Sequence, residues 1–302
     1  MIPTMDHGAR LGPGLHYGVE SDEYFADPCP EPSLTQSIAK ILLRQSPAHA
    51  RLAHPRLNPD YESDDPTKYD IGHIAHRLLL GRGRELEVLD YKDWRTKDAQ
   101  HHRADVAEAG QLGVLTKDFT RGLEMVESIR AQLEERGYGP DWYEPDVAIA
   151  AEVVAIANSR INEENFGSAQ WLRCMIDWMP HRTRLWDLKT TGRSAAPDEL
   201  WRQLVDADWP IQAAMHERIL DYLHPEDAGR REHRFVVVEN EPPYALSVVR
   251  MTEANMTIGR AQLDRAEVIW ATCMAAGRWP AYPLTDQNLE YPQWKMKAEM
   301  LE

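Results

Sequence analysis

Three short segments in the middle of the chain constrain its fold most strongly. Each is rich in apolar or β-branched residues, and polar, turn-like sequence separates them; they are residues 151–157 (AEVVAIA), 171–179 (WLRCMIDWM) and 184–190 (RLWDLKT). Their length and composition are typical of buried β-strands. Helical patterns lie before and after them. We therefore expect an α/β fold, with a central mixed β-sheet flanked by helices and a helical N-terminal layer.

The helical patterns give most of the other boundaries, because apolar residues recur at helical spacing and capping residues mark several ends. The expected helices of the first half are residues 34–44 with Thr35 as a cap, a short helix at Ser46-Pro47, residues 71–80 between Asp70 and Gly81, and an apolar stripe over 119–133 that ends at Gly137. After the strands we expect a helix pair over 198–223 interrupted at Pro210, a hairpin of 234–238 and 244–251, and a last helix over 253–276.

The two ends of the chain differ from this pattern. Residues 1–30 are rich in Gly, Pro and Asp and show neither a helical nor a strand period, so we expect a flexible N-terminal arm. Residues 31–302 are expected to form a single domain that closes with the last helix and an aromatic tail containing Tyr291 and Trp294.

Several classes of protein are disfavoured by composition. No stretch approaches the roughly 18 apolar residues that span a bilayer, and the opening residues lack the apolar core of a signal peptide, so we expect a cytoplasmic protein without a membrane partner. Cys29, Cys174 and Cys273 are too few and too scattered for a disulfide framework or a four-cysteine zinc or iron–sulfur site. No Walker A pattern appears, so we expect no use of ATP.

The segment that says most about chemistry is residues 174–191 (CMIDWMPHRTRLWDLKTT), in which Asp187 follows Asp177 by ten residues across an expected hairpin. Hydrolysis of a phosphodiester needs anionic ligands for a hard cation and a positive group beside the attacking water. One aspartate on each strand meets the first need. Lys189 lies two residues after Asp187 and therefore shares its strand face, so it can position the water.

This arrangement imposes a condition on the hairpin. A two-residue or four-residue turn would place Asp177 and Asp187 on opposite faces of the sheet. The two carboxylates share a face only if the connection has an odd number of residues or one strand contains a bulge.

The Asp-x-Lys pattern alone does not decide between two interpretations. Acidic and basic residues alternate on the exposed face of many hairpins, where they only form salt bridges. Here, however, Asp177 and Asp187 lie in otherwise apolar strands, where an uncompensated carboxylate is unfavourable. Charged groups in such positions are often functional.

A wider set of residues resembles a known superfamily. The set Gly72-x-x-x-His76, Glu152, Asp177, Asp187-x-Lys189 and Gln212 is similar to the motifs of the PD-(D/E)xK nucleases, in the branch with the RecB nuclease domain and the phage exonucleases. The resemblance is greater to the RecE, or exonuclease VIII, group of prophage recombination nucleases. It covers roughly residue 34 to the C-terminus, including the segments DWRTKDAQ and WPAYP. It implies a PD-(D/E)xK nuclease core.

The resemblance also implies roles for individual residues. Asp177, Asp187, Lys189 and Glu152 would form the catalytic site, and the implied metal ligands are His76, Asp177, Asp187 and the Leu188 carbonyl. Gln212 would face the DNA, and His216 occupies the position of a family tyrosine. Lys40 and Arg44 are candidate phosphate contacts on an early helix. Each of His76, Glu152 and His216 also has a plain structural interpretation, as a core, strand-surface or helix-face residue.

The implied activity is Mg²⁺-dependent, or Mn²⁺-dependent, digestion of linear duplex DNA from 5′ to 3′. Its product would be a 3′ single strand for a phage-type annealing protein, in the cytoplasm of a bacterial host. A structure-specific or single-strand endonuclease with the same site, and a catalytically idle DNA-binding protein, remain as alternatives. The net charge of −15 opposes binding to a polyanion. A ring, a tetramer by resemblance, would gather the basic residues of each subunit around the DNA.

Overall fold

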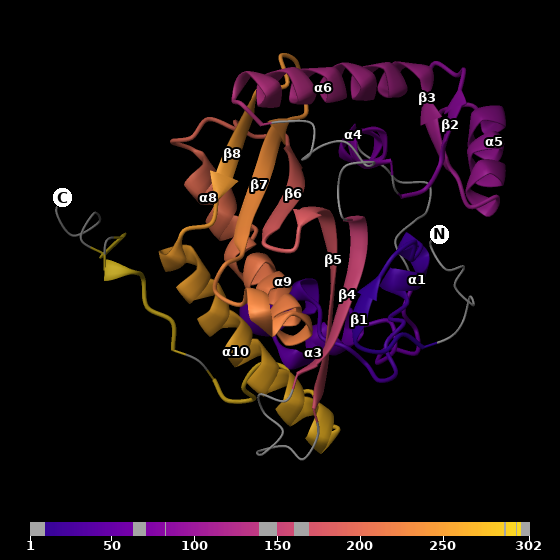
Figure 1. The fold of residues 1–302 in the computed structure, drawn as a ribbon. Helices are drawn as coiled ribbons and strands as arrows, with labels where there is room; N and C mark the ends of the chain where they lie inside the picture. The colour runs from indigo at the N-terminus through magenta and orange to yellow at the C-terminus, as the bar shows by residue number, and fades with distance from the viewer. Residues whose placement is uncertain are drawn as a thin grey trace.

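The computed structural model describes residues 10–62, 71–81, 83–138, 150–159, 169–286, 288–293, 295 and 296. A six-stranded sheet with the order β1-β4-β5-β6-β7-β8 forms its centre (Figure 1). The strands are β1 (Gly14–His16), β4 (Ala150–Ser159), β5 (Gln170–His181), β6 (Arg184–Thr191), β7 (Glu232–Glu239) and β8 (Leu246–Arg250). Only β6 and β7 pair in parallel within this sheet. The predicted α/β class with a mixed sheet is confirmed.

One face of the sheet is covered by four helices, α2 (Gln36–Arg44), α3 (Pro47–Leu52), α9 (Trp209–Leu223) and α10 (Glu253–Ala276). Their apolar residues form the largest core with the strands, and Trp270 and Ile211 lie fully buried in it. The Thr35 and Ser46 side chains accept the hydrogen bonds of helix N-caps, as the sequence predicts. Helix α10 has the predicted bounds.

The other face is covered by α4 (Ile71–Leu80) and α6 (Thr116–Glu135), which pack on Trp178, Trp186 and Val236 of the sheet. Both helices were expected from their periodicity, and Gly81 and Gly137 follow them with positive φ. The predicted cap at Asp70 lies outside the described residues. Two helices therefore enclose the sheet on the side opposite α9.

A small parallel unit adjoins α4 and α6 and was not predicted. It consists of β2 (Leu86–Leu89), α5 (Lys97–Glu108) and β3 (Leu112–Leu115), and the two strands pair only with each other. Each strand has four residues, too few to show a period, and their pairing spans 26 positions of sequence. In Figure 1 the unit lies beside the end of α6 and away from the main sheet.

The prediction of a flexible arm over residues 1–30 is wrong for residues 10–30. Strand β1 pairs with β4, and the short helix α1 (Ser21–Phe25) follows it. Leu11, Val19, Tyr24 and Cys29 are buried against β4. The physical reason is that this segment is held by long-range contacts, which its local composition does not reveal.

The predicted helix pair consists of α8 (Leu200–Asp206) and α9, and it is interrupted at Ala207 and Asp208 instead of Pro210. Asp208 has a left-handed conformation, and Pro210 occupies the first turn of α9, where its missing N–H has no effect. Helix α10 crosses α9 at this turn. A Cβ on Gly259 would lie 2.1 Å from the Pro210 carbonyl oxygen, so only glycine permits this approach.

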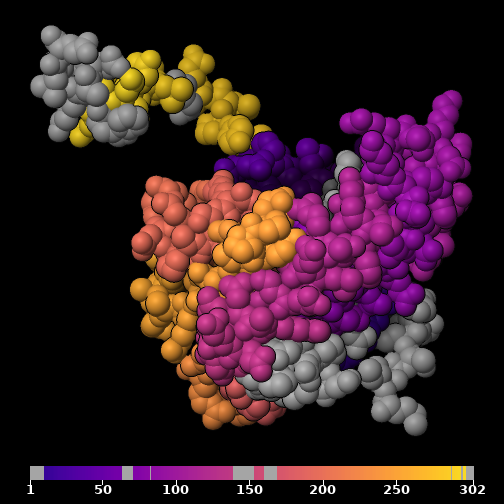
Figure 2. Space-filling model, turned by 90° about the horizontal axis from the view of Figure 1, so that it is seen from above, coloured from indigo at the N-terminus to yellow at the C-terminus, as the bar shows by residue number. Residues whose placement is uncertain are grey.

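The C-terminal tail leaves α10 and runs away from the rest of the molecule (Figure 2). Trp279 packs against Trp270, but Tyr282, Leu284, Leu289 and Tyr291 are exposed. Trp294 lies outside the described residues. A short 3-10 helix, η2 (Pro225–Asp227), connects α9 to β7. Among the described residues, no helix has the length and apolarity to cross a bilayer.

Glu267 is a buried carboxyl whose environment should make the stability of the fold depend on pH. Its side chain is buried in α10, and burial, with the nearby Asp264, raises its pKa to about 7 despite the opposing Arg218. A raised folded-state pKa stabilises the protein fully below the unfolded value of 4.5, and this contribution is lost as pH rises through about 7. We expect the free energy of unfolding to fall by roughly 3 kcal/mol over this window.

Glu267→Gln should flatten this pH dependence, because glutamine does not titrate. Denaturant unfolding between pH 4.5 and pH 8 measures it. Glu253→Gln is the matched control on the same helix, since its carboxylate is 78% exposed. An equally steep profile in Glu267→Gln would show that another group causes it.

Candidate active site

The hairpin of β5 and β6 brings the two predicted aspartates together. Trp178 pairs with Trp186 and His181 pairs with Arg184, and the register shifts by one residue between these pairs. Because Trp178 and Trp186 are partners, Asp177 and Asp187 are the next positions along the two strands and lie across from each other. The connection is a two-residue turn, so a bulge supplies the offset. The sequence condition on this hairpin is confirmed.

Asp177 is oriented by two neighbours on different elements. Its Oδ2 lies 3.4 Å from Nε2 of His76, which α4 presents, and accepts the backbone N–H of Leu188 at 3.0 Å. Burial alone would raise the pKa of this carboxyl, but His76, Lys189 and the Leu188 amide together lower it to about 2. Asp177 is therefore an anion over the whole physiological range.

Asp187 is more deeply buried, with 2% of its surface exposed. Its Oδ1 lies 2.5 Å from Nζ of Lys189, and its Oδ2 accepts a hydrogen bond from the Gln212 amide of α9. Burial and the neighbouring Asp177 charge raise the pKa of Asp187 to about 6. Burial alone would lower the pKa of Lys189, but the charges of Asp187 and Asp177 raise this pKa above its usual value. Lys189 therefore stays an ammonium.

Four elements thus converge on one site: α4 with His76, β5 with Asp177, β6 with Asp187 and Lys189, and α9 with Gln212. Leu188 contributes its amide, and the predicted role of its carbonyl stays a prediction. The backbone of Glu152 lies in β4 between residues that pair with Trp178 and Ile176, which places it opposite Asp177. Its side chain lies outside the described part of the chain, so its role also stays a prediction.

His216 does not occupy the position expected of a DNA contact. It is 1% exposed, and its Nδ1 lies 3.0 Å from Nε2 of His233 on β7. Burial lowers the pKa of His216 to about 3, so the ring is neutral. The prediction of a DNA contact at His216 is wrong for this structure, because α9 turns this residue toward the sheet.

The two basic residues expected on α2 have different surroundings. Burial, together with the Lys189 charge, lowers the pKa of Lys40 to about 8, although Asp208 and Asp187 oppose this shift, so Lys40 lies within electrostatic range of the site. Arg44 instead donates to the last two carbonyls of α8, with 2.6 Å to Val205, and pairs with Asp208 of the α8–α9 connection at 2.5 Å. These bonds give Arg44 a structural role, and DNA contacts by either residue stay predictions.

The surroundings of Lys189 include residues that sequence reasoning missed. Phe235 of β7 lies beneath it, with 5.7 Å from Nζ to the ring centroid, and His233 packs on Phe235. No local motif marks either residue. Only the parallel pairing of Asp187 with Phe235, and of Leu185 with His233, brings them to the site.

The residues present fit a hard divalent cation. Across the described ranges, no three His, Cys, Asp or Glu side chains converge as a preformed metal site. Mg²⁺ does not need such a cluster, since it keeps several waters and binds one or two carboxylates together with substrate phosphates. The Asp177 charge contributes to the raised pKa of Asp187, and a cation between the two carboxylates would relieve this repulsion. His76 adds an imidazole beside Asp177.

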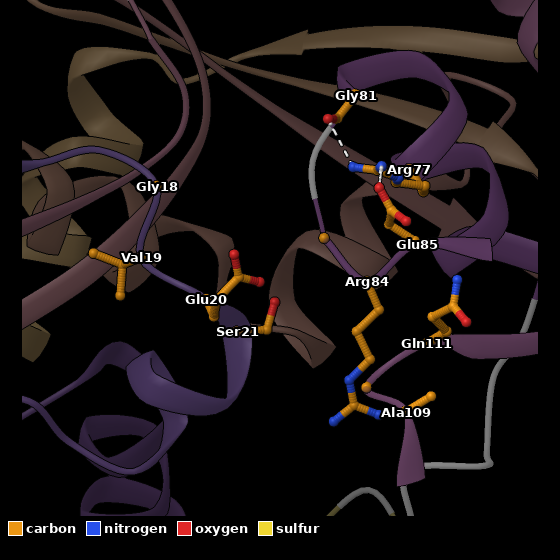
Figure 3. A pocket seen from close by; sticks show the side chains of 12 residues that line it. Gly18, Val19, Glu20, Ser21, Arg77, Gly81, Arg84, Glu85, Ala109 and Gln111 are labelled. Carbon is orange, nitrogen blue, oxygen red and sulfur yellow. Dashed lines mark hydrogen bonds and ion pairs between the residues drawn. The ribbon is translucent and has the colours of Figure 1, made fainter. Parts of the chain in front are cut away.

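A cavity of about 290 Å³ lies at the C-terminal end of α4, and its lining contains none of the residues of the candidate site (Figure 3). Arg77 and Arg84 line it. Arg77 donates to the Gly81 carbonyl at 2.8 Å and lies 3.7 Å from Glu85, while Arg84 pairs with Asp22 of α1. Both guanidiniums therefore tie α4 and the loop after it to their surroundings.

The sheet and its flanking helices define an exonuclease-like α/β fold. The crystal structure of a putative exonuclease from Eubacterium rectale matches with a TM-score of 0.54 over 93% of this chain and 96% of that chain, at 12% identity. The structure of LHK-Exo in complex with dAMP aligns over 70% of this chain and 93% of that chain, at 15% identity and a TM-score of 0.23 too low to support an argument. No family model and no curated protein matches the sequence. Identity this low establishes the fold alone.

His76 and His73 lie three residues apart on α4 and provide a matched pair of variants. His76→Ala should lower metal-dependent cleavage by roughly tenfold or more, because it removes the group that orients Asp177. His73→Ala should leave the rate within about twofold, since the His73 side chain is exposed. The metal concentration at half-maximal rate should rise only in the first variant. Equal, negligible effects would make His76 a structural residue.

Proposed function

We propose that this protein is a Mg²⁺-dependent exodeoxyribonuclease that degrades linear duplex DNA from its ends, in the 5′ to 3′ direction. One observation carries the proposal: a buried and a half-buried carboxylate from adjacent strands meet at a lysine that is ion-paired to the buried one. The exonuclease-like fold supports it. The polarity, and a single-strand annealing protein as partner, rest on the resemblance to the RecE group.

The side chains have distinct tasks in this mechanism. His76 and the Leu188 amide hold Asp177, and Gln212 holds Asp187, so both carboxylates keep one orientation. When bound, Mg²⁺ would be held by Asp177 and Asp187, with His76 at its edge, and would neutralise charge on the scissile phosphate. Lys189, fixed by Asp187, donates a hydrogen bond that directs the attacking water to phosphorus. Burial of Asp187 keeps bulk water from competing for these groups.

The direct test incubates the purified protein and Mg²⁺ with a linear duplex and with the same DNA as a covalently closed circle. Loss of the linear form alone supports an exonuclease. Cleavage of closed circles, or of a single-stranded circle, would instead assign the same site to an endonuclease. If the DNA stays intact in every reaction with Mg²⁺ or Mn²⁺, the result would favour the alternative of a catalytically idle DNA-binding protein. End-labelling of either strand then gives the polarity.

The oligomeric form is part of the proposal, because a charge of −15 opposes DNA binding by a monomer. We propose a closed ring of identical subunits, with a tetramer favoured. It would leave acidic surface outside and collect Lys40 and similar residues around the duplex. The exposed side chains of the tail, such as Leu284 and Leu289, suit contacts between subunits. Light scattering on the active protein measures its molar mass and so its oligomeric state. A monomer that digests long DNA processively would contradict the ring.

A further inference from the structure

A second cavity, of about 350 Å³, opens where four elements meet outside the carboxylate site. We name it the Trp94 pocket. It is lined by Ile71 at the start of α4, Trp94 before α5, Arg103 on α5, Asp118 and Arg121 on α6, and the β7–β8 turn at Asn240 and Glu241. The space-filling view shows that this turn (orange) lies against α6 (magenta) (Figure 2).

Two elements lead from the catalytic residues to this pocket. On α4, Ile71 precedes His76 by five residues, roughly 7.5 Å along the helix axis. On β6, Thr191 follows Lys189 by two residues, roughly 7 Å along the strand, and its carbonyl accepts the Asn240 N–H at 2.9 Å. At the roughly 3.4 Å rise of one DNA strand, two or three nucleotides cover this separation.

The pocket offers a fixed aromatic surface. The Arg103 guanidinium lies 4.6 Å from the Trp94 ring centroid, in cation–π contact. The Trp94 carbonyl accepts the Gln100 side-chain amide at 2.9 Å, and Thr96 caps α5. Trp94 is half-buried, so part of its surface stays accessible. A ring held in this way loses little conformational entropy when a planar ligand stacks on it.

The charges around the ring are balanced. Arg121 donates to the Glu241 carboxylate at 2.8 Å and to the Asn240 carbonyl at 3.1 Å, and the lining also contains the anion Asp118 and the cation Arg103. A pocket without excess positive charge is unsuited to a phosphate. Its aromatic surface, carboxylates and amide suit a nucleobase, which stacks on the ring and presents donors and acceptors at its edge.

We infer that the Trp94 pocket binds an unstacked nucleobase of single-stranded DNA, within a few nucleotides of the reacting phosphodiester. This inference rests on the proposed function for its substrate. A strand frayed from the duplex end supplies such a base, and stacking at Trp94 keeps that base out of the helix. The pocket thereby holds the unpaired strand next to the site.

The experiment measures binding of a short labelled single strand, and of the blunt duplex of the same sequence, by fluorescence anisotropy with Ca²⁺ in place of Mg²⁺. We expect Trp94→Ala to weaken single-strand binding about tenfold, since stacking on one aromatic ring contributes on this scale. Trp94→Phe should keep most of the affinity. Binding of the blunt duplex should be unchanged. Because the lost contact is not ionic, the fold-change should be the same at low and high salt.

Trp201→Ala is the matched control. Trp201 on α8 is 58% exposed and has Arg202 at 5.0 Å from its ring, but it does not line the pocket. The Trp201→Ala variant should bind the single strand and the blunt duplex with wild-type affinity. If Trp94→Ala is unstable in denaturant unfolding, Trp94→Leu keeps the apolar volume without the ring, and the same loss is expected.

Wild-type single-strand binding in stably folded Trp94→Ala or Trp94→Leu would overturn the inference. Displacement of the labelled strand by free deoxynucleoside monophosphates at comparable nucleotide concentration would also overturn it, in favour of a product site. The proposed function is tested separately by cleavage with Mg²⁺. If the wild-type protein cuts no DNA, but the Trp94 variants bind the single strand more weakly than the wild type, the proposed nuclease function is refuted and the inference about the pocket is supported.

Discussion

Alanine at Asp177, Asp187 or Lys189 should reduce cleavage of linear duplex DNA by about 10³-fold or more at saturating Mg²⁺. Each substitution removes either a carboxylate that fits the metal or the ammonium that positions the water, and such groups contribute several kcal/mol to the transition state. The loss should appear in the rate of the bound complex, measured under single-turnover conditions with enzyme in excess.

The controls separate chemistry from folding. Asp105→Ala and Lys97→Ala change exposed residues of α5 and should cut at the wild-type rate. Asp187→Asn keeps the size of the side chain that Gln212 contacts, so it should fold yet remain inactive. Ca²⁺ should support binding with little turnover, because its looser coordination orients water poorly. Wild-type cleavage by Lys189→Ala would refute the mechanism, whatever the two aspartates do.

Asp27→Ala should lower the free energy of unfolding by about 3–5 kcal/mol, the usual effect of removing one partner from a buried ion pair. The Asp27 carboxylate is fully buried and lies 2.9 Å from Nη1 of Arg173. It also accepts the Ser33 N–H at 2.9 Å and the Ser33 hydroxyl at 2.8 Å. Its loss leaves Arg173, itself 3% exposed, without its main counter-charge.

Denaturant unfolding measures this effect, and Asp22→Ala is the control. Asp22 is 72% exposed and pairs with Arg84, so its removal should change stability by less than about 1 kcal/mol. Since Asp27 joins residues 27–33 to β5, Asp27→Ala should also increase hydrogen exchange in β1. An equal, small change in both variants would show that the N-terminal segment is held by its apolar contacts alone.

The sequence predicts elements whose determinants are local. Apolar periodicity and caps define α2, α4, α6 and α10. For Asp177 and Asp187 to share a face, the hairpin needs an odd connection or a bulge, and β5 and β6 contain the bulge. The functional candidates in this hairpin can also be predicted from the sequence, because an uncompensated aspartate in an apolar strand is unfavourable and such a residue often has a functional role.

What the sequence does not reveal depends on pairings between distant residues. Residues 10–30 look unstructured by composition, yet β1 pairs with β4 more than 130 positions away. His216 looks like a surface residue of α9 until the parallel pairing of β6 and β7 places His233 beside it. In both cases the partner residue, rather than the residue itself, determines the environment.

Gly259 determines how closely α10 packs on α9, near the residue that holds Asp187. Because Gly259 has no side chain, α10 contacts the backbone of α9 directly at Pro210. Pro210 is two residues from Gln212, whose amide holds Asp187. Farther along α10, Trp270 packs against Trp279 at the start of the tail. The tail, α10 and α9 thus form a continuous series of packing contacts that leads from Trp279 to Gln212, the residue that holds Asp187.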